Sequence, residues 1–146
     1  MAKTRITITI LCLLFNLYLL GCATTVVTPQ QAMPVPNERI INNKYLASKI
    51  NTATSTLIFV RDSGLYGVGV TIYLYINGEE IAGFRPSEKL QLILDPGEYL
   101  LGVQSRPNFG LEQFVETPIR IEQSREYSFR ISSDYNKAIV QRTSAF

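Results

Sequence analysis

From about residue 54 onward, hydrophobic and polar residues alternate along the chain with a period of two. This period is typical of β-strands, in which successive side chains face opposite sides of the sheet. In residues 68–76, Val70, Ile72, Leu74 and Ile76 form the apolar set. Residues 56–61 are apolar at nearly every position, which predicts a strand covered on both faces. Similar patterns predict further strands at 79–85, 89–94, 98–104, 114–122, 126–132 and 137–142.

Turn residues separate these predicted strands. Asn77-Gly78 supplies two residues that tolerate positive φ, which a type I′ hairpin requires. Asp95-Pro96-Gly97 predicts a second tight turn, with Gly97 at a position of positive φ. Pro118 favours an edge position or a bulge for 114–122. Together these features predict an all-β fold, an antiparallel β-sandwich of about seven strands over residues 51–146.

Residues 1–21 have the pattern of a signal peptide. Lys3 and Arg5 precede a largely apolar run, 6–20, that is shorter than the roughly 20 residues of a membrane-spanning helix. The run ends in Leu19-Leu20-Gly21-Cys22, which resembles the bacterial lipobox. The resemblance implies cleavage between Gly21 and Cys22, a diacylglycerol on the Cys22 thiol and an acyl chain on its amino group. The alternative is a signal-anchor helix in which the cysteine occurs by chance.

Residues 22–50 are predicted to join the lipidated cysteine to the folded domain. Residues 23–36 are rich in Thr, Gln and Pro and contain no charge, which predicts a flexible tether that holds the domain clear of the lipid. Residues 37–50 could form a short helix capped by Asn37. Ala23 stands where an aspartate would resemble an inner-membrane retention signal, so we expect the outer membrane, on the side that faces the periplasm.

Composition narrows the function classes. The chain has 14 Lys+Arg and 12 Asp+Glu, and loss of Lys3 and Arg5 with the signal peptide leaves equal numbers. A neutral chain lacks the basic patch typical of nucleic-acid binding. It contains no histidine, and Cys12 leaves with the signal peptide. We therefore expect no enzyme, no metal site and no cofactor beyond the covalent acyl chains on Cys22.

The stretch 57–131 resembles a known group of proteins. The segments LIFVR, IYLYINGEEIAGF, LDPGEYLLGV and IRIEQSREYSFRI look like an uncharacterised family of bacterial lipoproteins. Its members carry a domain similar to PEGA and carboxypeptidase-regulatory-like modules. The resemblance implies a β-sandwich without known catalytic residues.

Two groups of residues are candidates for contact with a partner. Tyr73 and Tyr75 form an aromatic stripe on the polar side of one strand, unless the segment 37–50 covers them. The loop 105–113 carries Arg106, Asn108 and Phe109, and Tyr66 lies in another loop. Arginine and aromatic residues are enriched in binding hot spots.

Three functions remain open on this basis. The first is a lipid-anchored, non-enzymatic envelope lipoprotein whose sandwich binds another envelope protein. The second is a module that binds glycan, peptidoglycan or a small ligand through the tyrosines. The third, prompted by the terminal Phe146, is a small outer-membrane β-barrel.

Overall fold

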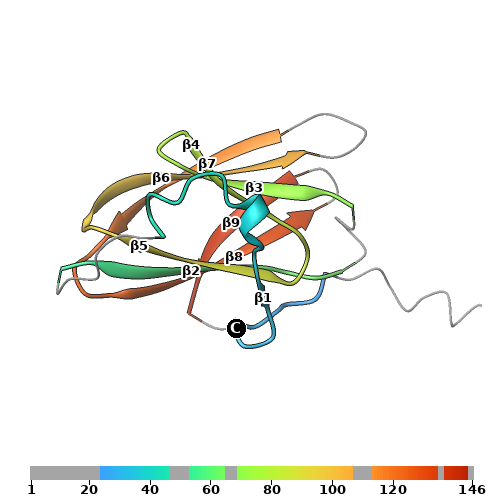
Figure 1. Ribbon diagram of the computed structural model, residues 1–146, viewed down its shortest axis with the longest axis horizontal. Coiled ribbons are helices and arrows are strands. Elements are labelled where there is room, and N and C mark those ends of the chain that lie inside the picture. The colour runs from blue at the N-terminus through green and yellow to red at the C-terminus, as the bar shows by residue number, and fades with distance from the viewer. Residues whose placement is uncertain (1–23, 47–52, 65–68, 107–112, 135–136, 145–146) are drawn as a thin grey trace, which may run out of the picture.

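The computed structural model describes residues 24–46, 53–64, 69–106, 113–134 and 137–144, and nearly all of its regular structure is β. The elements in chain order are β1 (Met33–Pro34), η1 (Asn37–Arg39), β2 (Ser55–Arg61), β3 (Thr71–Ile76), β4 (Glu79–Phe84), β5 (Glu88–Leu94), β6 (Gly97–Arg106), β7 (Gln113–Ile121), β8 (Glu126–Asp134) and β9 (Lys137–Thr143) (Figure 1). The predicted all-β fold is confirmed.

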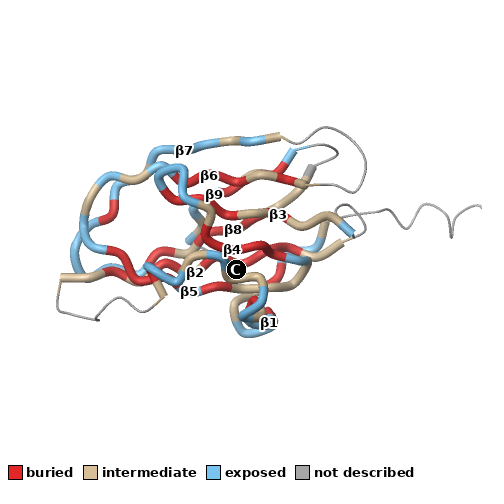
Figure 2. The backbone as a smooth tube through the Cα atoms, turned by 45° about the horizontal axis from the view of Figure 1, so that its top comes forward, coloured by how far each residue is buried: buried red, intermediate tan, exposed pale blue. Residues whose placement is uncertain are grey.

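The strands form two sheets that pack face to face as a sandwich (Figure 1). The five-stranded sheet has the order β1-β5-β2-β8-β9, and the four-stranded sheet has the order β4-β3-β6-β7. Most neighbouring strands are antiparallel, as predicted, but β2 pairs with β8 and β1 pairs with β5 in parallel. Strand β7 lies at one rim of the molecule and is mostly exposed (Figure 2).

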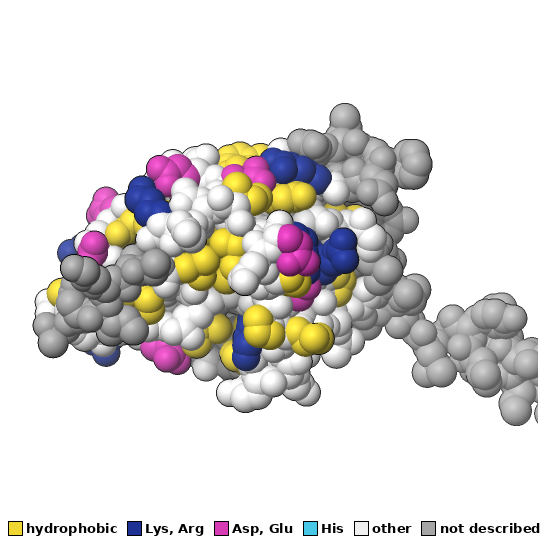
Figure 3. All heavy atoms as spheres, viewed as in Figure 1, with side chains coloured by type: hydrophobic (Ala, Val, Ile, Leu, Met, Phe, Trp, Pro, Cys, Tyr) yellow, Lys and Arg dark blue, Asp and Glu magenta, His cyan; other side chains and the backbone are white. Residues whose placement is uncertain are grey.

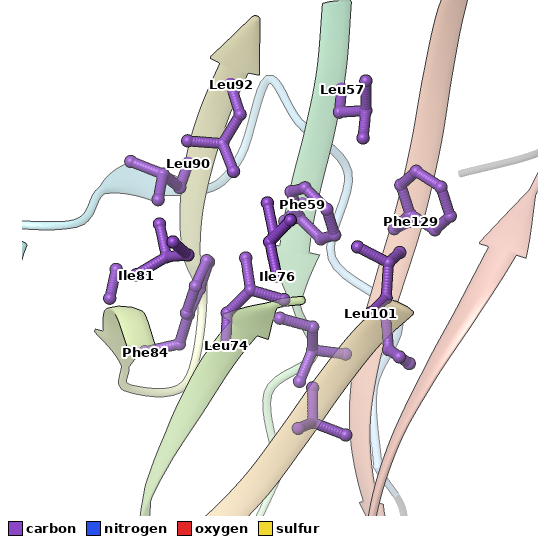
Figure 4. Packing of buried hydrophobic residues seen from close by; sticks show 14 of the residues in the cluster. Leu57, Phe59, Leu74, Ile76, Ile81, Phe84, Leu90, Leu92, Leu101 and Phe129 are labelled. Carbon is purple, nitrogen blue, oxygen red and sulfur yellow. The ribbon is translucent and has the colours of Figure 1, made fainter. Parts of the chain in front are cut away.

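The core lies between the sheets and is built from the alternating positions of the strands (Figure 4). Ile72, Leu74 and Ile76 of β3 are all fully buried, which confirms the period of two. Phe59 of β2 and Phe129 of β8 stack with ring centroids 4.9 Å apart. No buried side-chain polar atom of the described residues lacks a hydrogen-bond partner.

The two predicted turns have different outcomes. Asn77 and Gly78 have φ of 50° and 77°, and they join β3 to β4 as a hairpin, as predicted. The prediction of a tight turn at Asp95-Pro96-Gly97 is wrong in its detail, because Gly97 is the first residue of β6 and does not have a positive φ. The physical reason is topological. Strands β5 and β6 belong to different sheets, so Asp95 and Pro96 form a corner between the sheets and not a hairpin turn.

The predicted flexible tether is also wrong over the residues that the structure describes. We call residues 24–35 the strap, because they lie against the domain. Thr25 and Ser63 exchange two backbone hydrogen bonds, of 2.8 and 3.0 Å. Val27 and Ala32 are each only 6% exposed and pack on Val60 of β2. The strap therefore supplies the second cover that the apolar pattern of 56–61 predicts.

The chain then closes one side of the sandwich. Strand β1 extends the five-stranded sheet beside β5, and Val35 enters the core. Farther along, the backbone amides of Ile41 and Asn42 donate to the carbonyl of Ile81 in β4. The helix predicted at 37–50 is wrong for the described residues. They contain only the short 3₁₀ turn η1, and 47–50 lie outside the described residues.

A buried arginine joins both sheets at one end of the sandwich. Arg61 of β2 is 2% exposed and donates to the carbonyls of Phe84 and Val70 at 2.6 and 2.7 Å. Burial lowers the pKa of Arg61 to about 10, so it remains cationic at neutral pH. The next residue, Asp62, forms an ion pair with Arg130 of β8 at 2.5 Å. These contacts fix the segment to which the strap attaches.

Candidate functional site

The predicted tyrosine stripe lies on the outer face of the four-stranded sheet. Strand pairing places Tyr73 opposite Gln104 and Tyr75 opposite Glu80. Arg106, predicted to lie in a loop, is instead the last residue of β6, and its side chain belongs to the same face. We call these five residues the polar cluster.

Hydrogen bonds tie the polar cluster together. The Tyr75 hydroxyl lies 2.7 Å from the Glu80 carboxylate and 2.6 Å from the side-chain oxygen of Gln104. Arg106 donates to Tyr75 at 2.6 Å and to both carboxylate oxygens of Glu80, at 2.6 and 3.2 Å. Burial and the neighbouring Glu80 raise the pKa of Tyr75 to about 12. The hydroxyl is therefore held protonated between partners of the same sheet.

The Tyr73 ring is covered on two sides. The guanidinium carbon of Arg106 lies 4.1 Å from the ring centroid. A Cβ atom at Gly83 would lie 3.0 Å from the ring, so the ring rests on that glycine. The described part of segment 37–50 runs along the edge of β4, and its Arg39 donates to the carbonyl of Gly83, the partner of Tyr73. Contacts within the sheet therefore occupy Tyr73 and Tyr75.

One exposed aromatic residue extends this face toward β7. Phe114 is 47% exposed and meets Tyr75 edge to face, with centroids 5.1 Å apart. Its ring lies over Gly102, where an added Cβ would approach the ring to 2.8 Å. Phe114 was not among the predicted contact residues, although its outward position in a predicted strand could have indicated an exposed aromatic ring.

Five other predicted site residues fall in undescribed parts of the chain. Gly21, Cys22, Tyr66 and the pair Asn108 and Phe109 all lie outside the described residues. Their roles in cleavage, lipidation and contact therefore remain predictions.

A second surface is an open groove between β7 and β9. Its volume is about 810 Å³. It lies on the side of the sandwich opposite β1, because β1 and β9 form the two edges of the five-stranded sheet. The side chains that line it are mostly apolar or cationic: Leu101, Thr117, Pro118, Ile119, Arg120, Ile121, Glu122, Tyr127, Phe129, Ile139, Val140, Gln141 and Arg142. The guanidinium of Arg142 lies 4.4 Å from the centroid of the Tyr127 ring.

The two strands that border the groove differ in the hydrogen-bonding groups of their outer edges. Leu100 exchanges hydrogen bonds with Asn77, so its backbone faces away from β7. The backbone of its partner Pro118 therefore faces the outer edge of β7, where proline has no N–H group to donate. The expectation that Pro118 marks an edge strand is confirmed.

Strand β9 has no such interruption. The carbonyl of Ile131 in β8 accepts from Asp62, so the backbone of Ile131 faces β2. Its partner Val140 must then turn its amide and carbonyl to the outer edge, as must Ala138 and Arg142 by the alternation of the strand. Within the described residues no strand pairs with this edge. The edge of β9 can therefore accept an added strand.

The adjacent carboxylates of Glu79 and Glu80 have different partners. Glu79 forms an exposed ion pair with Lys44, whereas the adjacent Glu80 belongs to the polar cluster with Arg106. The described residues contain no group of three or more His, Cys, Asp or Glu that could hold a metal ion.

The comparisons with known proteins do not indicate what these surfaces bind. Comparison with protein-family models, with characterised proteins and with solved structures gave no match. The resemblance to a lipoprotein family therefore remains a prediction. No helix among the described residues is long and apolar enough to cross a membrane.

Proposed function

We propose that this chain is a lipid-anchored, non-enzymatic lipoprotein of the bacterial envelope whose β-sandwich binds an extended segment of another envelope protein. The observation that carries the proposal is the groove between β7 and β9. The chain's own residues 33–46 cover the opposite side of the sandwich, whereas on this side a groove lined by residues of both sheets remains at the surface. The lipid anchor at Cys22 is part of the proposal and is supported by the lipobox pattern.

The groove suits a polypeptide strand. The outward amides and carbonyls of β9 could form main-chain hydrogen bonds with an added strand, the recognition mode called β-augmentation. Alternate side chains of that strand would enter the groove on the same face of the sheet as Val140. Arg120 and Arg142 at the groove would favour an acidic residue in the bound segment.

The glycan alternative has less support. It relied on Tyr73 and Tyr75 as free stacking surfaces, but Arg106 covers the ring of Tyr73, and Tyr75 is only 9% exposed. Phe114 is the aromatic residue of this face that could still stack on a sugar.

Site-specific crosslinking tests the proposal. A photoreactive amino acid at Thr117 or Gln141, which line the groove, should give the same protein adduct in intact cells. The matched control is Gln91, an exposed residue on β5, where we expect no such adduct. Val140→Pro removes one outward donor from β9 and should abolish the groove adducts. Ile139→Asp places a charge in the groove and should do the same.

Two results would contradict this function. Equal adducts from Gln91 and from the groove positions would show that contact is not specific to the groove. If no position gives a protein adduct while the chain binds purified peptidoglycan, the glycan-binding module replaces the proposal.

A further inference from the structure

The strap limits how far the domain can stand from a lipid anchor. Thr25 is fixed to Ser63 by two backbone hydrogen bonds, and it follows Cys22 by three residues. An extended chain spans at most about 3.6 Å per residue, so the two Cα atoms lie within about 11 Å. The polar head-group layer on each side of a bilayer is roughly 5–7 Å thick. A lipid attached to Cys22 would therefore hold the surface around Thr25 at the level of the head groups.

Hydrogen bonds hold the strap against the domain at several points along its length. Thr28 and Gln31 form a tight turn in which the amide of Ala32 donates to the carbonyl of Thr28 at 3.0 Å. The ammonium group of Lys89 donates to the carbonyl of Pro29 at 2.6 Å. The amides of Met33 and Val35 donate to the carbonyls of Ser87 and Lys89, each at 2.9 Å. Release of this segment would break all of these hydrogen bonds and expose Val27 and Ala32.

The outer surface of the strap is suited to contact with lipid. Val26 and Met33 are 44% and 71% exposed, and both belong to the strap. Hydrophobic side chains reach the surface in the lower part of Figure 3, where β1 lies in Figure 1. The amide of Met33 is hydrogen-bonded to the carbonyl of Ser87, which places the turn with the exposed Arg85 next to it.

The charges around the strap are complementary to anionic head groups. Arg85 is exposed, and Lys89 lies against the strap. The nearby carboxylates of Glu88 and Asp62 are already held by Arg39 and Arg130. The surface therefore presents the exposed guanidinium of Arg85 beside exposed apolar side chains, a combination suited to the interface of anionic membranes.

We propose that the strap holds the β-sandwich directly on the lipid surface in one orientation, with Val26, Met33 and Arg85 against the head groups. The inference rests on the proposed lipidation of Cys22 and adds a second contact with the bilayer. Since the strap packs on Val60, on the outer face of the five-stranded sheet, this orientation turns the four-stranded sheet away from the membrane, and an envelope partner can reach the groove from the side of β7.

Depth measurements on the lipidated protein test the orientation. Apart from Cys12 and Cys22 the chain has no cysteine, so a single introduced cysteine can carry a spin label. The two positions are Arg85→Cys beside the strap and Glu116→Cys, an exposed position of β7 in the other sheet. The full chain is expressed in cells, purified in its lipidated form and placed in vesicles of phosphatidylethanolamine and phosphatidylglycerol. A nickel chelate on the lipid head groups should broaden the spectrum at position 85 several-fold more than at position 116.

A linker variant supplies the matched control. Ten Gly and Ser residues between Cys22 and Thr24 would add a reach of about 17 Å. The variant should remain lipidated while the difference between the two labels largely disappears.

The experiment distinguishes failure of the lipid anchor from failure of the proposed orientation. A mass spectrum with an unmodified Cys22 would overturn the lipid anchor of the proposed function. An acylated Cys22 with equal broadening at both positions, or with more at position 116, would overturn the orientation while the anchor stands.

Discussion

At the scale of single residues, the backbone of Gly78 makes a sharp prediction about stability. Its φ of +77° is strained for any residue with a Cβ, although nothing lies within 4 Å of that position. We expect Gly78→Val to lower the free energy of unfolding by about 1–3 kcal/mol through backbone strain. Gly97→Val is the matched control, because Gly97 begins a strand and an added Cβ meets Tyr99 at an ordinary 3.4 Å. Urea unfolding of both variants provides the comparison, and equal midpoints would contradict it.

The Tyr75 hydroxyl predicts a dependence of stability on pH. Its pKa rises from about 10 to about 12 on folding, so the unfolded chain loses the phenol proton first as the pH rises. The stabilisation by this group is complete below pH 10 and is lost between pH 10 and 12. Tyr75→Phe should cost about 1 kcal/mol at pH 8. That cost should shrink at pH 11, measured as the difference between the two proteins in urea. A constant difference would mean that the hydroxyl titrates normally.

At the scale of elements, the strap offers two adjacent valines in opposite environments. Val27 is 6% exposed against β2, whereas Val26 is 44% exposed. Val27→Ala should lower the free energy of unfolding by about 1.5 kcal/mol, since two buried methyl groups are lost. Val26→Ala should change it by less than about 0.5 kcal/mol. If residues 24–35 were a free tether, neither substitution would alter the urea midpoint.

The edge of β7 predicts a change in association. Pro118 faces outward and deprives this edge of one donor, which limits pairing with other chains. Pro118→Val restores the donor within a strand of nine residues. We expect the variant to associate with itself more strongly than the parent chain, as measured by sedimentation over a range of concentrations. Identical sedimentation of the two proteins would show that proline does not protect this edge.

Local patterns in the sequence predicted the elements better than their partners. The alternation around Ile72 and Leu74 and the pair Asn77-Gly78 depend only on neighbouring residues, so these predictions are confirmed. The error at Gly97 arose because the pattern does not say which sheet the next strand joins. The tether was misjudged because Val27 and Ala32 are isolated apolar residues without a period. Their burial depends on Val60, which lies more than 25 residues away.

The candidate sites were less predictable than the strands for the same reason. Tyr73 and Tyr75 were identified from alternation, but their contacts with Glu80 and Arg106 depend on the pairing of three strands. The groove could not be predicted at all, because it forms where two edge strands of different sheets meet. Pro118 indicated one of those edges, and no residue of 137–142 indicated the other.

At the scale of the whole molecule, anchoring and folding should be separable. Cys22→Ala should abolish lipidation and retention in the membrane fraction, because the acyl chains provide the proposed anchor. The domain should keep its fold, since the first observed contact of the chain with the sandwich is at Thr25. Fractionation of cells, with circular dichroism of the purified variant, checks both points. A variant that stays tightly in the membrane fraction would refute the lipobox interpretation.

The position of the strap near the N-terminus also determines when the strap can dock during secretion. A secreted chain crosses the membrane from its N-terminus, so the strap arrives before the partners that hold it. Thr25 can form its hydrogen bonds only after Ser63 has crossed the membrane, and Met33 can pair only after Ser87 and Glu88 have crossed. During that interval the Gly21–Cys22 bond lies in an open chain that the acylating and cleaving enzymes can reach. Once the strap has docked, only two residues lie between Cys22 and Thr25, so we expect the proposed acylation and cleavage to precede the last step of folding.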